Sequence, residues 1–262
     1  MTAASTSAFP QATAGAIPAG GAPCLLELHD VEFAYGSLQV LFGVSLSMPV
    51  AGRTAILGPN GAGKSTLLNV ISGTLPCLRG RVIFNGVDVT RMRPEKRARL
   101  GMVQVAGGRG TFPTLSVLEN LRIGAYHDLG NTELVRQRLE QVVELFPVLG
   151  ARLHQKGGSL SGGEQQMMGL GRALMSGAKL IMVDEFSLGL APIVVEEIAA
   201  RLNAAAQMGT SLLVVEQSIN VALSLADDIH VLEKGEIRFS GSAEELMRSD
   251  GVLQEAFFGK AE

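Results

Sequence analysis

Apolar residues follow two different spacings along the chain, and the change between them marks its organisation. Early in the chain, apolar and polar residues partly alternate, which predicts a strand-rich edge over residues 25–57. This alternation is carried by Leu26, Leu28, Val31 and Phe33. From about residue 114 to 175 the spacing becomes helical. One apolar helix face, expected to be core, is formed by Val135, Leu139, Val142, Val143 and Phe146.

Strands and helices alternate again beyond residue 179, which is typical of an α/β fold with a parallel sheet. The predicted elements are strands at 180–184, near 212–215 and at 229–232, a helix opened by Pro192, and a last helix with a capping box of Ser242 and Glu245. We therefore expect an α/β domain over residues 24–262, with a central, mainly parallel sheet, an antiparallel β edge and a helical subdomain at about 108–175. Residues 1–23 are rich in Ala, Ser, Gly and Pro and are expected to be a disordered tail.

A glycine-rich segment between a short apolar run and an amphipathic helix is typical of a phosphate-binding loop. Its residues are Gly58, Pro59, Asn60, Gly61, Ala62, Gly63, Lys64, Ser65 and Thr66. Glycines let the backbone wrap phosphates, so that amide groups and the positive end of the helix hold the oxygens. Lys64 is expected to contact the β- and γ-phosphates of ATP, and the Ser65 hydroxyl to bind Mg²⁺. A glycine-rich turn without a function is the competing interpretation.

Two acids stand at the end of the apolar run 180–183, where a buried parallel strand would deliver them to the edge of its sheet. We assign Asp184 to Mg²⁺, through water, and Glu185 to polarising the water that attacks the γ-phosphate. A solvated strand end is the alternative. The glycine-rich loop favours the functional interpretation, since two carboxylates there need a cation nearby.

The heptad Leu160-Ser161-Gly162-Gly163-Glu164-Gln165-Gln166 follows the phosphate loop by about a hundred residues, and Ser161 can cap the helix after it. With these three motifs in this order, residues 25 to 258 resemble the nucleotide-binding subunit of an ABC transporter, a P-loop NTPase. The resemblance implies a dimer in which Ser161, Gly162 and Gly163 of one subunit contact the γ-phosphate held by the other. It also places Tyr35 against adenine, although a strand-edge tyrosine is the alternative, and a loop over 187–190 at the dimer interface.

Within that family, the chain is most similar to subunits that drive uptake of branched-chain amino acids, or of urea and similar solutes. The similar stretches are Tyr35-Gly36 with Gln39-Val40-Leu41, residues 160–167, residues 187–192 and Val215-Glu216-Gln217. Gln217 stands where most of the family has a switch histidine. Its amide can bind a phosphate oxygen but cannot act as an acid or base, so Glu185 would carry more of that role.

The sequence departs from this branch at several positions. Gly107 stands where a polar residue helps to hold Mg²⁺, and Gln104 is a possible substitute. Phe186 replaces a usual proline, and Gly169 and Gly171 lie in a predicted helix, where each costs about 0.5–1 kcal/mol relative to Ala. These changes bear on the hydrolysis rate and on coupling more than on nucleotide binding.

Charge and composition limit the possible partners. The net charge of −3 gives no overall field for nucleic acid. One basic cluster is expected to be a solvated helix face, or else a contact for anionic lipid or a partner loop: Arg91, Arg93, Lys96, Arg97 and Arg99. No uninterrupted apolar stretch reaches 18 residues, so a membrane role would come through a partner. Cys24, Cys77 and the four histidines show no metal-binding spacing, and the two cysteines suit a reducing cytoplasm.

We therefore expect a cytoplasmic ATPase subunit, peripheral on the inner face of the plasma membrane, that powers an importer of amino acids. Expected partners are transmembrane permease subunits docked near residues 106–126, a second ATPase subunit of the same or a similar kind, and a solute-binding protein. A weakly hydrolysing partner subunit is one alternative, and urea or short-amide import is another. A soluble ATPase of nucleic-acid repair or cluster assembly fits less well, because repair members carry long coiled-coil insertions that this chain lacks.

Overall fold

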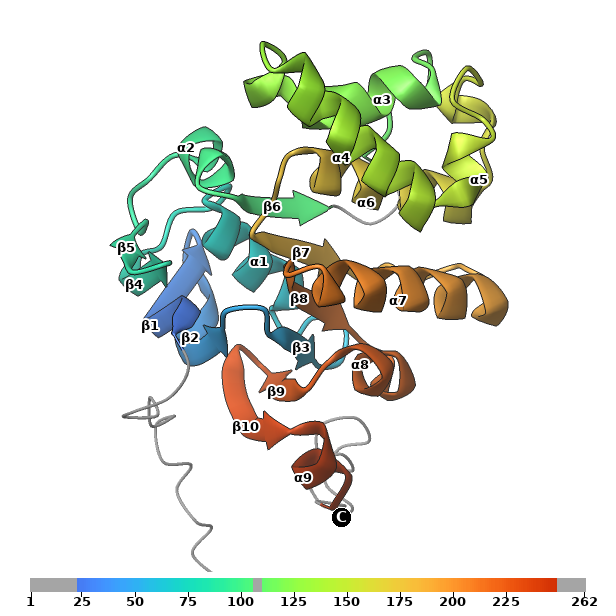
Figure 1. The fold of residues 1–262 in the computed structure, drawn as a ribbon. Helices are drawn as coiled ribbons and strands as arrows, with labels where there is room; N and C mark the ends of the chain where they lie inside the picture. The colour runs from blue at the N-terminus through green and yellow to red at the C-terminus, as the bar shows by residue number, and fades with distance from the viewer. Residues whose placement is uncertain (1–22, 106–109, 249–262) are drawn as a thin grey trace, which may run out of the picture.

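A six-stranded, mostly parallel sheet forms the centre of the protein (Figure 1). The computed structural model describes residues 23–105 and 110–248. Strand order in this sheet is β10-β9-β3-β8-β7-β6, and β10 runs antiparallel to β9 while the other neighbours are parallel. The strands are β3 (Arg53–Leu57), β6 (Met102–Val105), β7 (Leu180–Asp184), β8 (Ser211–Glu216), β9 (Asp228–Glu233) and β10 (Glu236–Ser242).

The direction of these strands brings the predicted motifs to one edge. The carboxyl ends of neighbouring parallel strands meet at the same side of a sheet. The glycine-rich loop follows β3, the acid pair ends β7, and Gln217 follows β8, which lies between them. Motifs that are more than a hundred residues apart in the sequence therefore come together.

A second, antiparallel sheet has the order β2-β1-β4-β5 and confirms the predicted antiparallel edge. Its strands are β1 (Cys24–Tyr35), β2 (Leu38–Pro49), β4 (Arg79–Phe84) and β5 (Val87–Asp88). Helix α1 (Lys64–Ser72) packs into the core between the two sheets, where its Leu67 and Leu68 share one hydrophobic cluster with Leu26 of β1 and Ile56 of β3. The loop that opens α1 is therefore attached to a helix that is buried against both sheets.

The predicted helical region consists of α3 (Val117–Gly124), α4 (Thr132–Leu145), α5 (Pro147–Gly150) and α6 (Gly162–Met175), with short 3-10 turns at Tyr126–Asp128 and Gly157–Ser159. In Figure 1, α3, α4 and α5 gather beyond the β6 edge of the sheet. Most of the expected apolar face packs inward, since Val135, Val142 and, just after α4, Phe146 are buried and Leu139 packs against the same cluster. Val143, the fifth residue of that face, is half-buried. Within the part of the chain that the structure describes, no helix is both long and apolar enough to cross a membrane.

The remaining helices are α2 (Pro94–Arg99), α7 (Pro192–Gln207), α8 (Ile219–Leu225) and α9 (Ala243–Arg248). Pro192 opens α7 as the sequence predicts, because a proline fits the first turn, where its missing N–H has no helical partner. Ser242 and Glu245 form the predicted reciprocal cap of α9, with the Ser242 amide 2.8 Å from the Glu245 carboxylate. Both local signals thus gave the correct helix starts.

Arg97 corrects the interpretation of the basic cluster as one solvated face. Its side chain is 1% exposed and donates hydrogen bonds to the carbonyls of Val70 (2.9 Å) and Ile71 (2.6 Å) in the last turn of α1. It also donates to the carbonyls of Met92 (3.0 Å) and Thr90 (2.9 Å). Carbonyls at a helix end lack helical partners and lie at the negative end of the dipole, so a guanidinium there stabilises α1.

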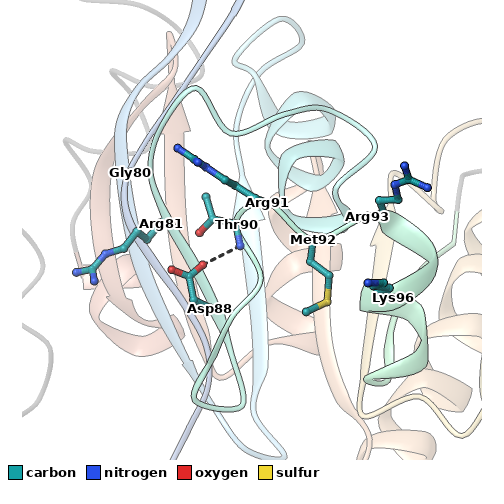
Figure 2. Close-up of a pocket in the computed structure, with 8 residues that line it drawn as sticks. All are labelled: Gly80, Arg81, Asp88, Thr90, Arg91, Met92, Arg93 and Lys96. Carbon is teal, nitrogen blue, oxygen red and sulfur yellow. Dashed lines mark hydrogen bonds between the residues drawn. The ribbon is translucent and has the colours of Figure 1, made fainter.

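The other members of the cluster are exposed. Arg91, Arg93 and Lys96 line a hollow of about 750 Å³ together with Arg81 of β4 (Figure 2). Figure 2 shows Arg81 and Arg93 pointing to opposite sides, while the Asp88 carboxylate accepts a hydrogen bond of 2.9 Å from the Thr90 amide. Arg81 and Arg93 therefore diverge instead of facing one ligand position, which agrees with a solvated face.

Candidate functional site

The glycine-rich loop turns sharply between β3 and α1. Gly61 and Gly63 have φ angles of 81° and 103°, values that favour glycine because a side chain would be strained there. A Cβ atom at Gly58 would collide with the carbonyl oxygen of Leu232 on β9. The loop is therefore built from close backbone approaches, and its composition follows from that geometry.

Lys64 is held inside this loop and is 4% exposed. Its ammonium group donates to the carbonyls of Gly58 (2.9 Å) and Pro59 (3.0 Å) and lies 3.0 Å from the Glu185 carboxylate. The structure thus brings together two predicted residues that are far apart in sequence. A phosphate bound in the loop would compete with Glu185 for this cation.

Ser65 and Asp184 lie side by side at the same edge. The Ser65 hydroxyl donates a hydrogen bond of 3.1 Å to the Asp184 carboxylate. Burial raises the pKa of Asp184, and the hydrogen bond from Ser65 opposes that shift. A hydroxyl and a carboxylate oxygen are ligands of the kind that Mg²⁺ prefers, so the pair fits the predicted metal position. Among the described residues, no three or more His, Cys, Asp or Glu side chains form a group that could hold a metal ion.

Glu185 adopts a backbone conformation that is uncommon for a residue with a side chain. Its φ is 42°, in the left-handed region, which costs about 1–2 kcal/mol for such residues. Its amide donates a hydrogen bond of 2.9 Å to the Val215 carbonyl of β8. Backbone strain of this kind persists only where neighbours hold it, and it is concentrated at functional sites.

Glu216, which the sequence interpretation missed as a site residue, ends β8 beside this turn. It is 1% exposed, and its carboxylate accepts hydrogen bonds from the Ser187 amide (3.2 Å) and hydroxyl (2.7 Å). Its carbonyl accepts from the Gly58 amide at 3.3 Å. An acid at the end of an otherwise apolar strand was the available signal. The next residue, Gln217, is exposed and lines a hollow of about 300 Å³ with Glu185.

The Ser161 turn begins α6 with a capping box. The Ser161 hydroxyl accepts a hydrogen bond from the Glu164 amide at 3.4 Å, and the Ser161 amide donates to the Glu164 carboxylate at 2.8 Å. Gly163 is required by packing, since a Cβ atom there would collide with Val194 of α7. Gly162 lines a hollow of about 420 Å³ with Asp184 and Glu185. The predicted cap is confirmed, and Gly162 in the first turn of α6 shares this hollow with the acid pair.

Tyr35 ends β1 with its ring 51% exposed and in edge contact with Phe33, at a centroid distance of 4.7 Å. An exposed ring can accept a stacked base.

The nearby β9–β10 turn joins the antiparallel sheet to the phosphate loop. Gly235 donates its amide to the Ala62 carbonyl (2.9 Å) and accepts from the Phe42 amide (2.9 Å) on β2. We call this turn the Gly235 brace.

Several residues differ from the pattern of the branch that the sequence resembles, and the structure accounts for them in different ways. Gly107 lies outside the described residues. Gln104, its possible substitute, donates a hydrogen bond of 3.1 Å to the Asn69 side chain on α1. Phe186 is 2% exposed and packs in the cluster that includes α6 and α7, so an apolar ring there fills the core.

Comparison with known proteins identifies the family. The sequence model of the family described as "ABC transporter" matches residues 41–187. The chain belongs to the ABC transporter family. This confirms the predicted resemblance and the P-loop fold class, and it makes the chain an ATP-binding, ATP-hydrolysing subunit of this family.

Two curated ABC relatives are named as transporters of branched-chain amino acids. The chain is 36% identical over 235 residues to the high-affinity branched-chain amino acid transport ATP-binding protein BraG of Pseudomonas aeruginosa, covering 90% of this chain and 100% of that one. It is also 36% identical over 227 residues to the probable branched-chain amino acid transport ATP-binding protein LivF of Archaeoglobus fulgidus, covering 86% and 95%. The predicted branch is thus confirmed as a resemblance.

Solved structures of ABC cassettes have the same fold. An ATP-binding cassette of an ABC transporter in its ADP conformation superposes with a TM-score of 0.81 at 30% identity, covering 90% of this chain and 99% of that one. A nucleotide-free ATP-binding cassette gives a TM-score of 0.78 at 30% identity, covering 90% and 100%. The cassette fold therefore occurs both with ADP and without nucleotide.

Proposed function

We propose that this ABC ATPase powers the import of branched-chain amino acids. It would work on the inner face of the plasma membrane, paired with itself or a similar ATPase, and serve permease subunits and a solute-binding protein. The similarity to BraG over the full length of that protein carries the proposal. The permease and the solute-binding protein would select the substrate. The evidence for amino acids is therefore the sequence similarity of this subunit to BraG and LivF.

The proposed hydrolytic roles follow from the contacts at the sheet edge. Lys64 exchanges its ion pair with Glu185 for the phosphates of ATP, and this exchange leaves the Glu185 carboxylate able to polarise the attacking water. Ser65 and Asp184 would hold Mg²⁺, which neutralises phosphate charge when bound. Gln217 would hydrogen-bond a phosphate oxygen.

The other predicted contacts lie around the nucleotide. Tyr35 would stack on adenine, and backbone amides of the loop from Gly58 to Thr66 would bind the phosphates. Residues 161–163 of a second subunit would complete the site, because the capped start of α6 presents further amide donors to an anion. The residue roles thus divide between two chains.

A groove beside α2 is the proposed docking site for a permease. It has a volume of about 850 Å³ and separates the end of α2 and β6 from α3 and α6. Its lining includes Arg99, Gln104, Ile123, Tyr126 and Arg172. The Tyr126 ring is 69% exposed. An exposed aromatic side chain with apolar and basic neighbours suits a protein interface. The groove overlaps the region near 106–126 expected for docking.

The transport proposal is tested by uptake of labelled leucine, isoleucine and valine in cells that lack the gene. Cells given the wild-type gene should regain uptake, and cells given Lys64→Ala should not. Lys96→Ala, which changes an exposed lysine of α2, is the matched control and should restore uptake. Normal uptake of all three amino acids without the gene, with labelled urea uptake lost, would support the urea alternative.

The weakly hydrolysing alternative is tested by the ATPase rate of the purified protein with Mg²⁺. Loss of turnover in Glu185→Gln would establish a working hydrolytic site. If the wild-type protein binds ATP without turnover and Gly107→Gln restores hydrolysis, the chain is a nucleotide-gated partner subunit. The glycine at position 107 of the sequence is the observation that favours this second candidate.

A further inference from the structure

The buried acid of β8, Glu216, bonds to the segment that follows Glu185. We propose that Glu216 is a positioning residue that, through Ser187, holds the main chain of Glu185 in the conformation used for hydrolysis. The inference rests on the proposed role of Glu185. It assigns a task to a carboxylate that touches neither the phosphate loop's lysine nor the proposed metal ligands.

Two consecutive residues of β8 fasten the main chain on both sides of the Glu185 side chain. Before it, the Glu185 amide donates to the Val215 carbonyl at 2.9 Å. After it, the Ser187 amide and hydroxyl both donate to the Glu216 carboxylate, at 3.2 and 2.7 Å. The strained φ of 42° lies between these two attachments. Without the second one, the chain from residue 186 onward has less to hold it in a left-handed turn.

Burial makes the contact between Glu216 and Ser187 stronger than a hydrogen bond on the protein surface. Glu216 is 1% exposed, and a buried carboxylate is costly unless its oxygens are hydrogen-bonded. Ser187 supplies two donors to it, the Gln217 main chain supplies another, and bonds to a charged acceptor are stronger than neutral ones. Burial raises the pKa of Glu216, while the hydrogen bonds from Ser187 lower it and the nearby Glu185 raises it.

The same residue also contacts the phosphate loop. Its carbonyl accepts the Gly58 amide at 3.3 Å, and its successor in the chain is Gln217. Beyond Ser187, the chain becomes exposed at Leu188, which is 74% exposed. Glu216 therefore connects the end of β8 both to the phosphate loop and to the loop that carries Glu185. A role only in packing would not require a hydrogen-bond acceptor here.

The first experiment compares turnover with nucleotide affinity in four variants. Glu216→Ala should lower kcat by about tenfold to a hundredfold, because a small displacement of a catalytic group has that effect, while the Kd for ATP stays near wild type. Ser187→Ala, which keeps the amide donor, should lose less. Glu216→Gln should approach wild type, since its amide can still accept from the Ser187 amide. Asp227→Ala is the control, because it removes a hydrogen-bonded acid paired with Arg53 at the opposite edge of the sheet.

A double variant identifies the group through which Glu216 acts. Glu216→Ala added to Glu185→Gln should cause no further loss of kcat, because residues that act as a unit are not additive. The proposal is overturned if Glu216→Ala keeps the wild-type kcat, or if kcat, ATP affinity and Tm all fall together as for a general loss of structure. If Glu185→Gln itself leaves turnover unchanged, the proposed role of Glu185 fails instead.

A second measurement decides the positioning role even without turnover. Amide hydrogen exchange at residues 185 and 187 should become faster by about tenfold in Glu216→Ala, while the amides of β3 stay protected. Asp227→Ala should leave residues 185 and 187 unchanged. Equal protection of these two amides in Glu216→Ala and wild type would overturn the proposal.

Discussion

Replacing either of two glycines in one helix by alanine should change the free energy of unfolding, with opposite signs at the two positions. Gly169 and Gly171 both lie in α6, and replacing a helical glycine by alanine gains about 0.5–1 kcal/mol. At Gly169 the nearest atom to an added Cβ is a Val105 methyl at 3.4 Å, an ordinary contact. At Gly171 the added Cβ would lie 2.9 Å from a Leu121 methyl and 3.0 Å from a Val142 methyl.

The magnitudes follow from these contacts. Overpacking a buried site costs about 1–3 kcal/mol. After the gain from removing a helical glycine is subtracted, Gly171→Ala should lower the free energy of unfolding by up to about 2 kcal/mol. Gly169→Ala should gain about 0.5–1 kcal/mol. Urea unfolding followed by circular dichroism measures both, because the chain contains no Trp and two Tyr for fluorescence. Equal stabilisation of the two variants would refute the close packing of α3 and α4 against this face of α6.

Three other perturbations have defined outcomes. Between pH 7 and 5, the unfolding free energy of wild type should fall by about 2 kcal/mol relative to His230→Gln in urea titrations. Burial lowers the pKa of His230 to about 4, so the unfolded chain takes up the proton first. Arg97→Ala should destabilise by about 2–4 kcal/mol through its lost hydrogen bonds to carbonyls, whereas exposed Arg99→Ala should change stability by less than about 0.5 kcal/mol. Glu185→Gln should tighten ATP binding about fivefold in calorimetry, since ATP no longer competes for Lys64; weaker binding would contradict the exchange.

Features set by neighbouring residues could be predicted from the sequence. The glycine-rich loop, the strand ending in Asp184 and Glu185, and the cap of α6 each depend on a few consecutive side chains. The meeting of the glycine-rich loop with the acid pair at one edge was also predictable, because parallel strands end on the same side of a sheet. The roles assigned to these residues in hydrolysis stay predictions until the variants are measured.

Contacts between distant segments could not be predicted in the same way. Arg97 and Arg99 look equivalent in the sequence, yet only Arg97 points to the end of α1, and its partners lie 26 and 27 residues away. The Glu216 carboxylate meets Ser187 across 29 residues. Periodicity identifies the buried face of one element and says nothing about which side chain of another element meets it. The packing need for Gly171 was missed for the same reason.

The Gly235 brace decides where a reporter can be built into this protein. A short exposed hairpin turn is an obvious place for an epitope tag or a fluorescent domain. Here an insertion between Lys234 and Gly235 would pull the Ala62 carbonyl and the Phe42 amide apart from their shared partner and distort the nucleotide loop. The turn at Gly209, exposed and with nothing within 4 Å of an added Cβ, offers room at the opposite edge of the sheet. A label placed there would report on the protein without disturbing its phosphate-binding loop.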